Sequence, residues 1–104
     1  MKNIVVLFNL KQGVDIDAYE QWAKTTDLPI VNGLPSIEKF EVFKTTGLFG
    51  SDESAPYQYV ELLTINNLEV FGDDVSTPTM QKVAAEFQGF ADSPMFITLE
   101  QLVA

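Results

Sequence analysis

The spacing of hydrophobic and polar residues changes several times along this chain, and each change marks an expected element of secondary structure. Residues 3–10 are apolar at both alternating positions and rich in β-branched side chains, which is typical of a central strand covered on both faces. Further strands are expected at residues 36–47, at residues 57–65 and from residue 95 to about residue 103. Together these segments predict a four-stranded sheet.

The first segment with helical spacing follows the first strand. Asp17 and Glu20 have the spacing of an N-cap and its capping-box partner, so the helix is expected to begin there. Pro29 is expected to end it near Asp27, because the residue before a proline is disfavoured in the helical region. The buried stripe of this helix is predicted to contain Tyr19, Trp22, Ala23 and Thr26.

The second helix is expected to begin at Thr77 and Pro78, because a hydroxyl cap followed by proline is a strong helix start. Gly89 and Pro94 bound its end. A short helical turn is predicted at residues 68–71, and a loop at residues 72–74.

The resulting order is strand, helix, strand, strand, helix, strand, which predicts one α+β domain over residues 1–104. Two helices of this size cover only one face of a four-stranded sheet. The first and last strands are nevertheless apolar on both faces, so the uncovered face needs a partner. The simplest partner is a second copy of the same sheet, which predicts a two-fold homodimer with sheets packed face to face.

Composition restricts the chemistry. The 104 residues contain no His, no Cys and no Arg, which removes the usual metal ligands, the thiol nucleophile and the proton shuttle that titrates near neutrality. The acidic loop residues around positions 52 and 73 lack the spacing of a calcium-binding loop. We therefore expect no metal site and no cofactor, and chemistry based on carboxylates, lysines, hydroxyls and aromatic rings.

Charge restricts the partners. Fifteen acidic and six basic side chains give a formal net charge of −9, so the surface repels nucleic acid and anionic membranes. The apolar run at residues 4–8 is too short for a signal-peptide core or a membrane span. A cytoplasmic protein that binds neither nucleic acid nor membrane is expected.

Four segments of the chain resemble the dimeric α+β barrel proteins, which have a ferredoxin-like βαββαβ fold: residues 19–22, 27–31, 34–42 and 59–63. Many relatives have a His-Leu-Pro-like turn after the first helix, a Leu-Pro-Gly-like turn before the second strand, and an apolar-Glu-apolar third strand. Here Asp27 stands in place of that histidine and Ser36 in place of the glycine. Imidazole-based proton transfer therefore does not carry over to this chain.

Within that superfamily the chain is similar to the RedY-like (HapK-like) proteins of prodigiosin-type pigment biosynthesis. The resemblance implies a role in a tripyrrole pathway and a small, apolar, heteroaromatic ligand. An acidic chain without arginine is compatible with a neutral or cationic ligand of this kind.

Two carboxylates are the candidate catalytic residues. Glu61 is flanked by residues that favour burial, and burial would raise its pKa toward neutrality. Alternatively, it pairs with Lys39 or Lys44 on the neighbouring strand, or lies at the dimer seam. Asp27 is expected where the helix ends, either binding a pyrrole N–H or a cationic group, or acting as a solvated turn residue that bonds to backbone N–H groups.

Four aromatic residues are candidates for substrate binding: Tyr19, Trp22, Tyr59 and Phe40. Tyr19 and Trp22 can both face the sheet and form a wall for a flat ligand, but an aromatic pair at helical spacing is more often plain core. Tyr59 has the same two interpretations. Lys39 is the lysine placed well inside a strand, where Schiff-base chemistry is the less favoured alternative to pairing with nearby glutamates.

Three functions fit these residues. One is a cofactor-free enzyme that assists condensation, cyclisation or dehydration of a pyrrole intermediate, with Glu61 and Asp27 moving protons. Another is a carrier that binds such an intermediate without turnover, and the effect of Glu61→Gln on the rate separates the two. A ligand-sensing dimerisation module is the third, for which a partner pull-down is the discriminating observation.

Overall fold

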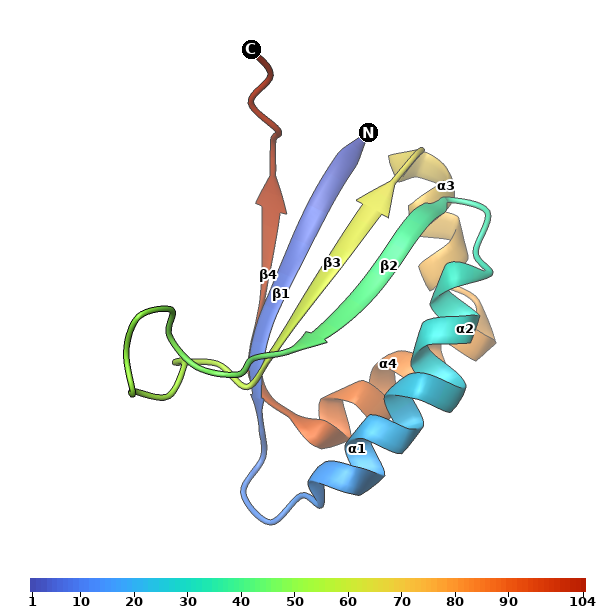
Figure 1. Ribbon diagram of the computed structural model, residues 1–104. Coiled ribbons are helices and arrows are strands. Elements are labelled where there is room, and N and C mark those ends of the chain that lie inside the picture. The colour runs from blue at the N-terminus through green and yellow to red at the C-terminus, as the bar shows by residue number, and fades with distance from the viewer.

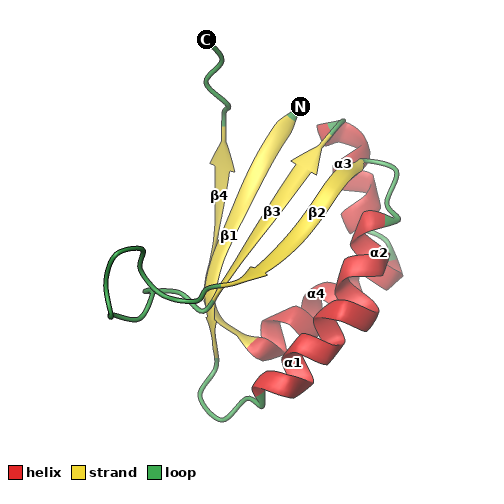
Figure 2. Ribbon diagram, in the orientation of Figure 1, coloured by secondary structure: helices red, strands yellow, loops and turns green.

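The computed structural model describes all residues, Met1–Ala104, and contains one antiparallel sheet of four strands with the helices on one side (Figures 1 and 2). The elements in chain order are β1 (Lys2–Leu10), α1 (Ile16–Trp22), a π-helical segment (Ala23–Asp27), α2 (Leu28–Asn32), β2 (Ile37–Lys44), β3 (Tyr59–Ile65), α3 (Leu68–Val75), α4 (Pro78–Phe90) and β4 (Ala91–Leu99). The spatial strand order is β2-β3-β1-β4. The predicted α+β class and ferredoxin-like topology are confirmed.

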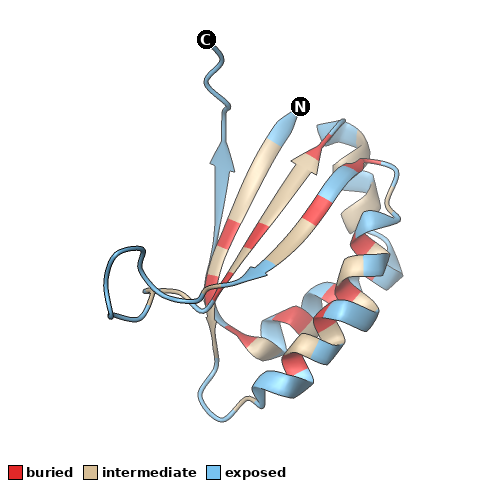
Figure 3. Cartoon of the chain, viewed as in Figure 1, coloured by how far each residue is buried: buried red, intermediate tan, exposed pale blue.

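The register of the sheet decides which side chains face the helices. Val6 of β1 pairs with Glu61 of β3, and Phe8 pairs with Tyr59, so these four side chains share one face. All four are buried. Figure 3 shows the buried residues gathered along the middle of the sheet and on the facing sides of the helices.

The core on this face has two parts. One is built around Val6, Phe8, Tyr19, Tyr59 and Phe87. Its aromatic rings pack mostly edge to face. The other lies toward the far end of β3 and consists of Val31, Ile37, Phe40, Ile65, Met80 and Val83. Glu61 lies on β3 between Tyr59 of the first part and Ile65 of the second.

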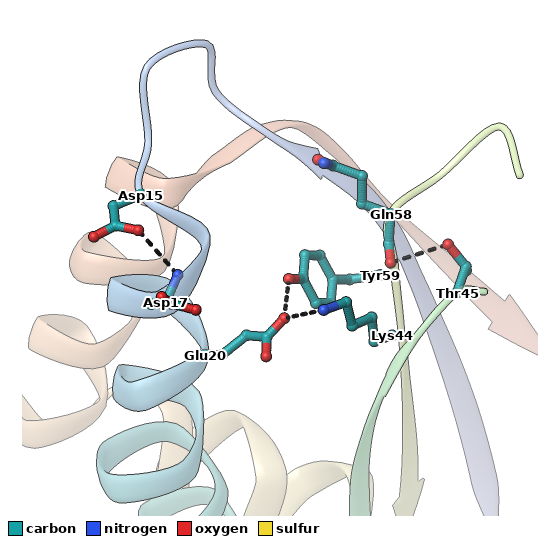
Figure 4. Close-up of polar contacts among 7 residues, drawn as sticks. All are labelled: Asp15, Asp17, Glu20, Lys44, Thr45, Gln58 and Tyr59. Carbon is teal, nitrogen blue, oxygen red and sulfur yellow. Dashed lines mark hydrogen bonds and ion pairs between the residues drawn. The ribbon is translucent and has the colours of Figure 1, made fainter. Parts of the chain in front are cut away.

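The start of the first helix differs from the prediction. Asp15, not Asp17, is the N-cap: its carboxylate accepts a hydrogen bond from the backbone N–H of Asp17 at 3.1 Å (Figure 4). Glu20 does not complete a capping box, because its carboxylate instead contacts Tyr59 and Lys44. The helix consequently begins two residues earlier than an N-cap at Asp17 implies, at Ile16.

The predicted end of this helix near Asp27 is wrong. The helix continues through Pro29 to Asn32, because the segment before the proline widens into a π turn in which the Leu28 N–H bonds to the Ala23 carbonyl. The wider turn also changes which side chains face the sheet. The buried positions on this helix are Tyr19, Ala23, Asp27 and Val31, four residues apart.

The end of the chain also differs in detail. β4 begins at Ala91 rather than at Met95 and ends at Leu99, and it takes Pro94 into the strand. The proline is accommodated because β4 is an edge strand with a bulge opposite the Leu7–Asn9 step of β1, where Ser93 has a φ of 46°.

Helix boundaries in the second half follow local capping. Thr77 caps α4 as predicted, since its hydroxyl accepts a hydrogen bond from the Met80 N–H at 3.3 Å. α4 runs through Gly89 to Phe90. α3 extends to Val75 and therefore includes residues predicted as a loop. Its start is capped by Asn67, whose side chain accepts hydrogen bonds from the backbone N–H groups of residues 69 and 70.

The opposite face of the sheet has no helix over it (Figure 2). Its side chains are of the other parity and are mostly apolar: Val5, Leu7, Phe43, Val60, Leu62, Met95, Ile97 and Leu99. Several are substantially exposed, including Phe43 at 46% and Ile97 at 39%. An apolar surface of this kind is typical of an interaction site. None of the helices is long and apolar enough to span a membrane.

Candidate functional site

An apolar cavity of about 300 Å³ lies between the helix-covered face of the sheet and the helices. It is lined by Ile4, Asp27, Val31, Leu34, Phe40, Glu61, Leu63, Phe71, Val75, Met80, Val83, Ala84, Phe87, Gln88 and Phe96. Three of the predicted site residues, Asp27, Glu61 and Phe40, are therefore brought together on its wall. A mostly apolar lining with a few convergent polar groups is the usual composition of a small-molecule site.

Glu61 reaches the cavity from the middle of β3. The residue is only 5% exposed, and its Oε2 is buried without a hydrogen-bond partner. The alternative that Glu61 forms an ion pair is wrong, since Lys39 pairs with Glu41 at 3.3 Å and Lys44 pairs with Glu20 at 3.1 Å. Nor does it lie on the helix-free face, where a seam between two sheets would be.

Asp27 approaches from the opposite wall, at the end of the π-helical segment. It is 5% exposed, and neither a lysine nor a backbone N–H group contacts its carboxylate. The alternative of a solvated turn residue is therefore wrong. Asp27 also does not lie at the end of the helix, because the helical stretch continues to Asn32.

The two carboxyl groups influence each other's protonation. Burial raises the pKa of Asp27 from 3.8 to about 7. Burial, and secondarily the nearby charge of Asp27, raises the pKa of Glu61 from 4.5 to about 8. The pair therefore holds and releases protons around neutral pH, in a cavity that otherwise offers hydrocarbon. That is the arrangement required for general acid–base chemistry.

Tyr59 lies next to this pair but points its hydroxyl elsewhere. The hydroxyl donates to Glu20 Oε2 at 2.6 Å, and the same oxygen contacts Lys44 (Figure 4). This bond, followed by the one to Lys44, lowers the pKa of Glu20. Burial, followed by the hydrogen bond to Glu20, raises the pKa of Tyr59. Its ring is core, stacked on Phe8 at 5.6 Å.

Trp22 does not line the cavity. Its ring packs against Tyr19 and Phe90, and its indole N–H donates to Glu86 Oε1 at 3.3 Å. Tyr19 is fully buried beside the carboxyl pair and lines a smaller hollow of about 110 Å³, together with Tyr59. The wall expected from Tyr19 and Trp22 is thus an aromatic core behind the site rather than a surface of the cavity.

Several lining residues were missed by the sequence analysis because they come from α3, α4 and β4. Val83 and Phe87 of α4 are buried in the core and also face the cavity. Phe96 lines the cavity while remaining 57% exposed. No periodic signal distinguishes a side chain that lines a cavity from one that fills a core.

A second hollow, of about 320 Å³, is polar and lies along the loop between β2 and β3. Its acidic side chains, Asp52 and Glu53, are exposed, as expected for solvated loop residues. Lys39 is exposed and paired with Glu41, as favoured over Schiff-base chemistry. No group of three or more acidic side chains converges in the way a metal ion requires.

The family model described as REDY-like protein HapK matches residues 2–102 of this chain. The chain belongs to the REDY-like HapK family. No curated protein matches the sequence significantly.

Solved structures agree with this membership. The crystal structure of HapK from Hahella chejuensis is similar at 28% identity, with a TM-score of 0.80 and coverage of 100% of this chain and 95% of that chain. At3g17210 from Arabidopsis thaliana is similar in fold at 19% identity, with a TM-score of 0.80 and coverage of 100% and 98%. A dimeric ferredoxin-like protein from Thermobifida fusca is similar in fold at 15% identity, with a TM-score of 0.72 and coverage of 96% and 90%.

The raised pKa values predict that the folded chain loses stability as the pH rises. An acid whose pKa is raised by folding keeps protons that the unfolded chain has released, so its contribution is complete below the unfolded pKa and is lost as the pH passes the folded pKa. For Asp27 this window runs from 3.8 to about 7, and for Glu61 from 4.5 to about 8. Asp27→Asn and Glu61→Gln should each reduce this loss of stability with rising pH. For each kcal/mol of unfolding free energy that a variant recovers at about pH 8, its melting temperature should rise by about 4–8 °C.

Calorimetric melting temperatures across this pH range provide the measurement. Glu100→Gln, beyond the end of β4, is the matched control and should follow the original chain at every pH. Curves for both cavity variants that run parallel to that of the original chain would contradict the raised pKa values.

Proposed function

We propose that this chain binds an apolar, heteroaromatic pyrrole intermediate and assists its condensation, cyclisation or dehydration by cofactor-free acid–base catalysis. In this proposal it is a biosynthetic protein of a prodigiosin-like tripyrrole pigment pathway. The observation that carries the proposal is that two carboxyl groups without an ion-pair partner, Asp27 and Glu61, lie in the wall of a mostly apolar cavity. Membership of the REDY-like HapK family supports the choice of pathway.

The cavity supports the choice of ligand. Its apolar wall suits the faces of flat rings, and its volume of about 300 Å³ is near the lower end of small-molecule sites. Phe40 and Phe87 supply aromatic surface to it. The two carboxyl groups are its charged members, so a ring N–H or a group that becomes cationic during the reaction finds a partner there, whereas an anion does not.

The two carboxyl groups have complementary roles. In the proposal Glu61 is the general acid and Asp27 accepts a proton, and the two groups titrate as a coupled pair around neutral pH. Acid–base assistance of this kind typically contributes about 10²–10⁴-fold in rate. Such an enhancement suits a reaction between components that are already reactive.

The second partner in the proposal is another copy of the chain. The helix-free face of the sheet is apolar, and burying it against an identical face removes it from water. A structural neighbour with the same fold is described as dimeric. The cavity lies on the opposite face, so dimerisation leaves the carboxyl pair within each copy.

Ligand binding in this cavity is tested by two neighbouring positions on α4. Ala84 and Ala85 are both exposed, but only Ala84 lines the cavity. Ala84→Trp should place an indole in the cavity and weaken the binding of a bipyrrole by about tenfold or more, equivalent to about 1.4 kcal/mol. Ala85→Trp should leave the affinity unchanged. Isothermal titration calorimetry provides the measurement, and equal affinities for the two variants would place the ligand elsewhere.

Turnover is tested at Glu61. Glu61→Gln should lower the rate of tripyrrole formation from a bipyrrole and a monopyrrole by about 10²-fold or more, while the affinity for the bipyrrole changes little. Product absorbance gives the rate, and Glu100→Gln is the control. An unchanged rate with unchanged affinity would support the carrier function instead of the enzyme.

Dimerisation is tested on the edge strand. Ile97 lies on the helix-free face, and Phe49 is an equally apolar but fully exposed residue of the loop between β2 and β3. In sedimentation experiments at micromolar concentration the original chain and Phe49→Lys should have twice the chain mass, because the face remains intact. Ile97→Lys should sediment as a monomer. A monomeric original chain would overturn the face-to-face arrangement.

A further inference from the structure

Tyr19 has a buried hydroxyl that lacks a hydrogen-bond partner. Its ring is held from several sides: Tyr59 lies 4.8 Å away, Phe90 5.5 Å and Phe8 5.8 Å, each edge to face. These contacts fix the position of the ring and therefore of its hydroxyl oxygen. Buried hydroxyl groups without a partner are uncommon, and each one calls for a physical reason.

An oxygen of the carboxyl pair also lacks a partner. Glu61 Oε2 is also buried and also unpartnered. Tyr59, against which the Tyr19 ring packs, precedes Glu61 by two residues and shares its face of β3. Burial, then the charge of Glu61 and then that of Asp27 raise the pKa of Tyr19, as expected for a phenol close to both carboxylates.

We propose that the Tyr19 hydroxyl donates a hydrogen bond to Glu61 Oε2, directly or across one buried water, whenever the Glu61 carboxyl is ionised. Tyr19 is then a positioning residue. It holds one oxygen of the carboxylate within the protein while the carboxyl group remains on the cavity wall. It also supplies the stabilisation that the charged form requires in an apolar environment.

The groups around Glu61 leave this role to Tyr19. The paired residues on β1 and β2 are Val6 and Val42, which offer no side-chain donor. The π-helical segment supplies Asp27, which repels a second negative charge. The Tyr59 hydroxyl is already bonded to Glu20 on the side of Lys44, as Figure 4 shows. From α4, the cavity receives the apolar Val83 and Phe87. It also receives Gln88, whose amide can donate, but Gln88 is an exposed residue, whereas Glu61 Oε2 is buried.

This inference rests on the proposed acid–base role of Glu61 and completes it. A general acid must become a stable carboxylate after it gives up its proton, and must regain that proton before the next turnover. A phenol is neutral throughout the pH range of the pair, so Tyr19 donates without competing for the proton. The protonated carboxyl is neutral and requires this bond less than the carboxylate does.

Two matched variants test the proposal. Tyr19→Phe and Tyr59→Phe each remove one hydroxyl from adjacent rings of the same aromatic cluster. Carbon-13 NMR of the glutamate carboxyl groups gives the titration of Glu61, identified as the resonance lost in Glu61→Gln. In Tyr19→Phe the proton affinity of Glu61 should rise by about tenfold or more, as expected for loss of one donor to a charged group. Tyr59→Phe should leave it unchanged.

An unchanged Glu61 titration in Tyr19→Phe, or equal shifts in both variants, would overturn the proposal. If Tyr19→Phe does not fold, replacing the tyrosines of Tyr59→Phe with fluorotyrosine provides the second measurement. The more acidic phenol is a stronger donor, so the proton affinity of Glu61 should fall, and no change would again overturn the proposal.

The titration needs no ligand, which separates this inference from the proposed function. A bipyrrole that fails to bind, with a Glu61 titration that responds to Tyr19, would reject the function and retain the contact. A bipyrrole that binds, with a titration that ignores Tyr19, would reject the contact and retain the function.

Discussion

The closeness of two buried carboxyl groups that have no counter-charge is the constraint on which the site depends. Asp27 and Glu61 come from opposite walls of one apolar cavity, and neither forms an ion pair. All six lysines are elsewhere, and the two that form ion pairs do so with glutamates outside the cavity. Without a cation, burial is the main influence on the pKa values of the pair, with the charge of Asp27 as a second contribution at Glu61, and both pKa values move toward neutral pH.

The π turn makes this closeness possible. In a regular α-helix eight residues cover about 2.2 turns, so Asp27 would be rotated away from the direction of Tyr19. The wider turn before Pro29 takes up the difference, and the buried positions recur every four residues from Tyr19 to Val31. Pro29, which was expected to end the helix, instead follows the π turn that directs the Asp27 carboxyl group toward the sheet.

The sequence predicted the topology because each strand and helix carries its own local signal. The order of elements, the cap at Thr77 and the burial around Glu61 all followed from spacing and residue type. The position of Asp27 did not, because a π turn has no recognisable spacing and the rule for residues before proline favours a helix end. Trp22 was placed with the ligand because helical spacing gives the direction of a side chain but not whether a cavity or a neighbouring ring lies there.

The choice between enzyme and carrier follows from what each would require of the cavity. A carrier for an apolar ligand needs only a cavity lined by hydrocarbon side chains. Buried carboxyl groups without partners lower the stability of the folded protein. Replacing them with apolar residues of similar volume would improve a pure binding protein. Two such groups facing one cavity, with a phenol behind one of them, are instead what proton transfer requires. We therefore favour catalysis, in which the unfavourable burial of these groups becomes the source of their reactivity.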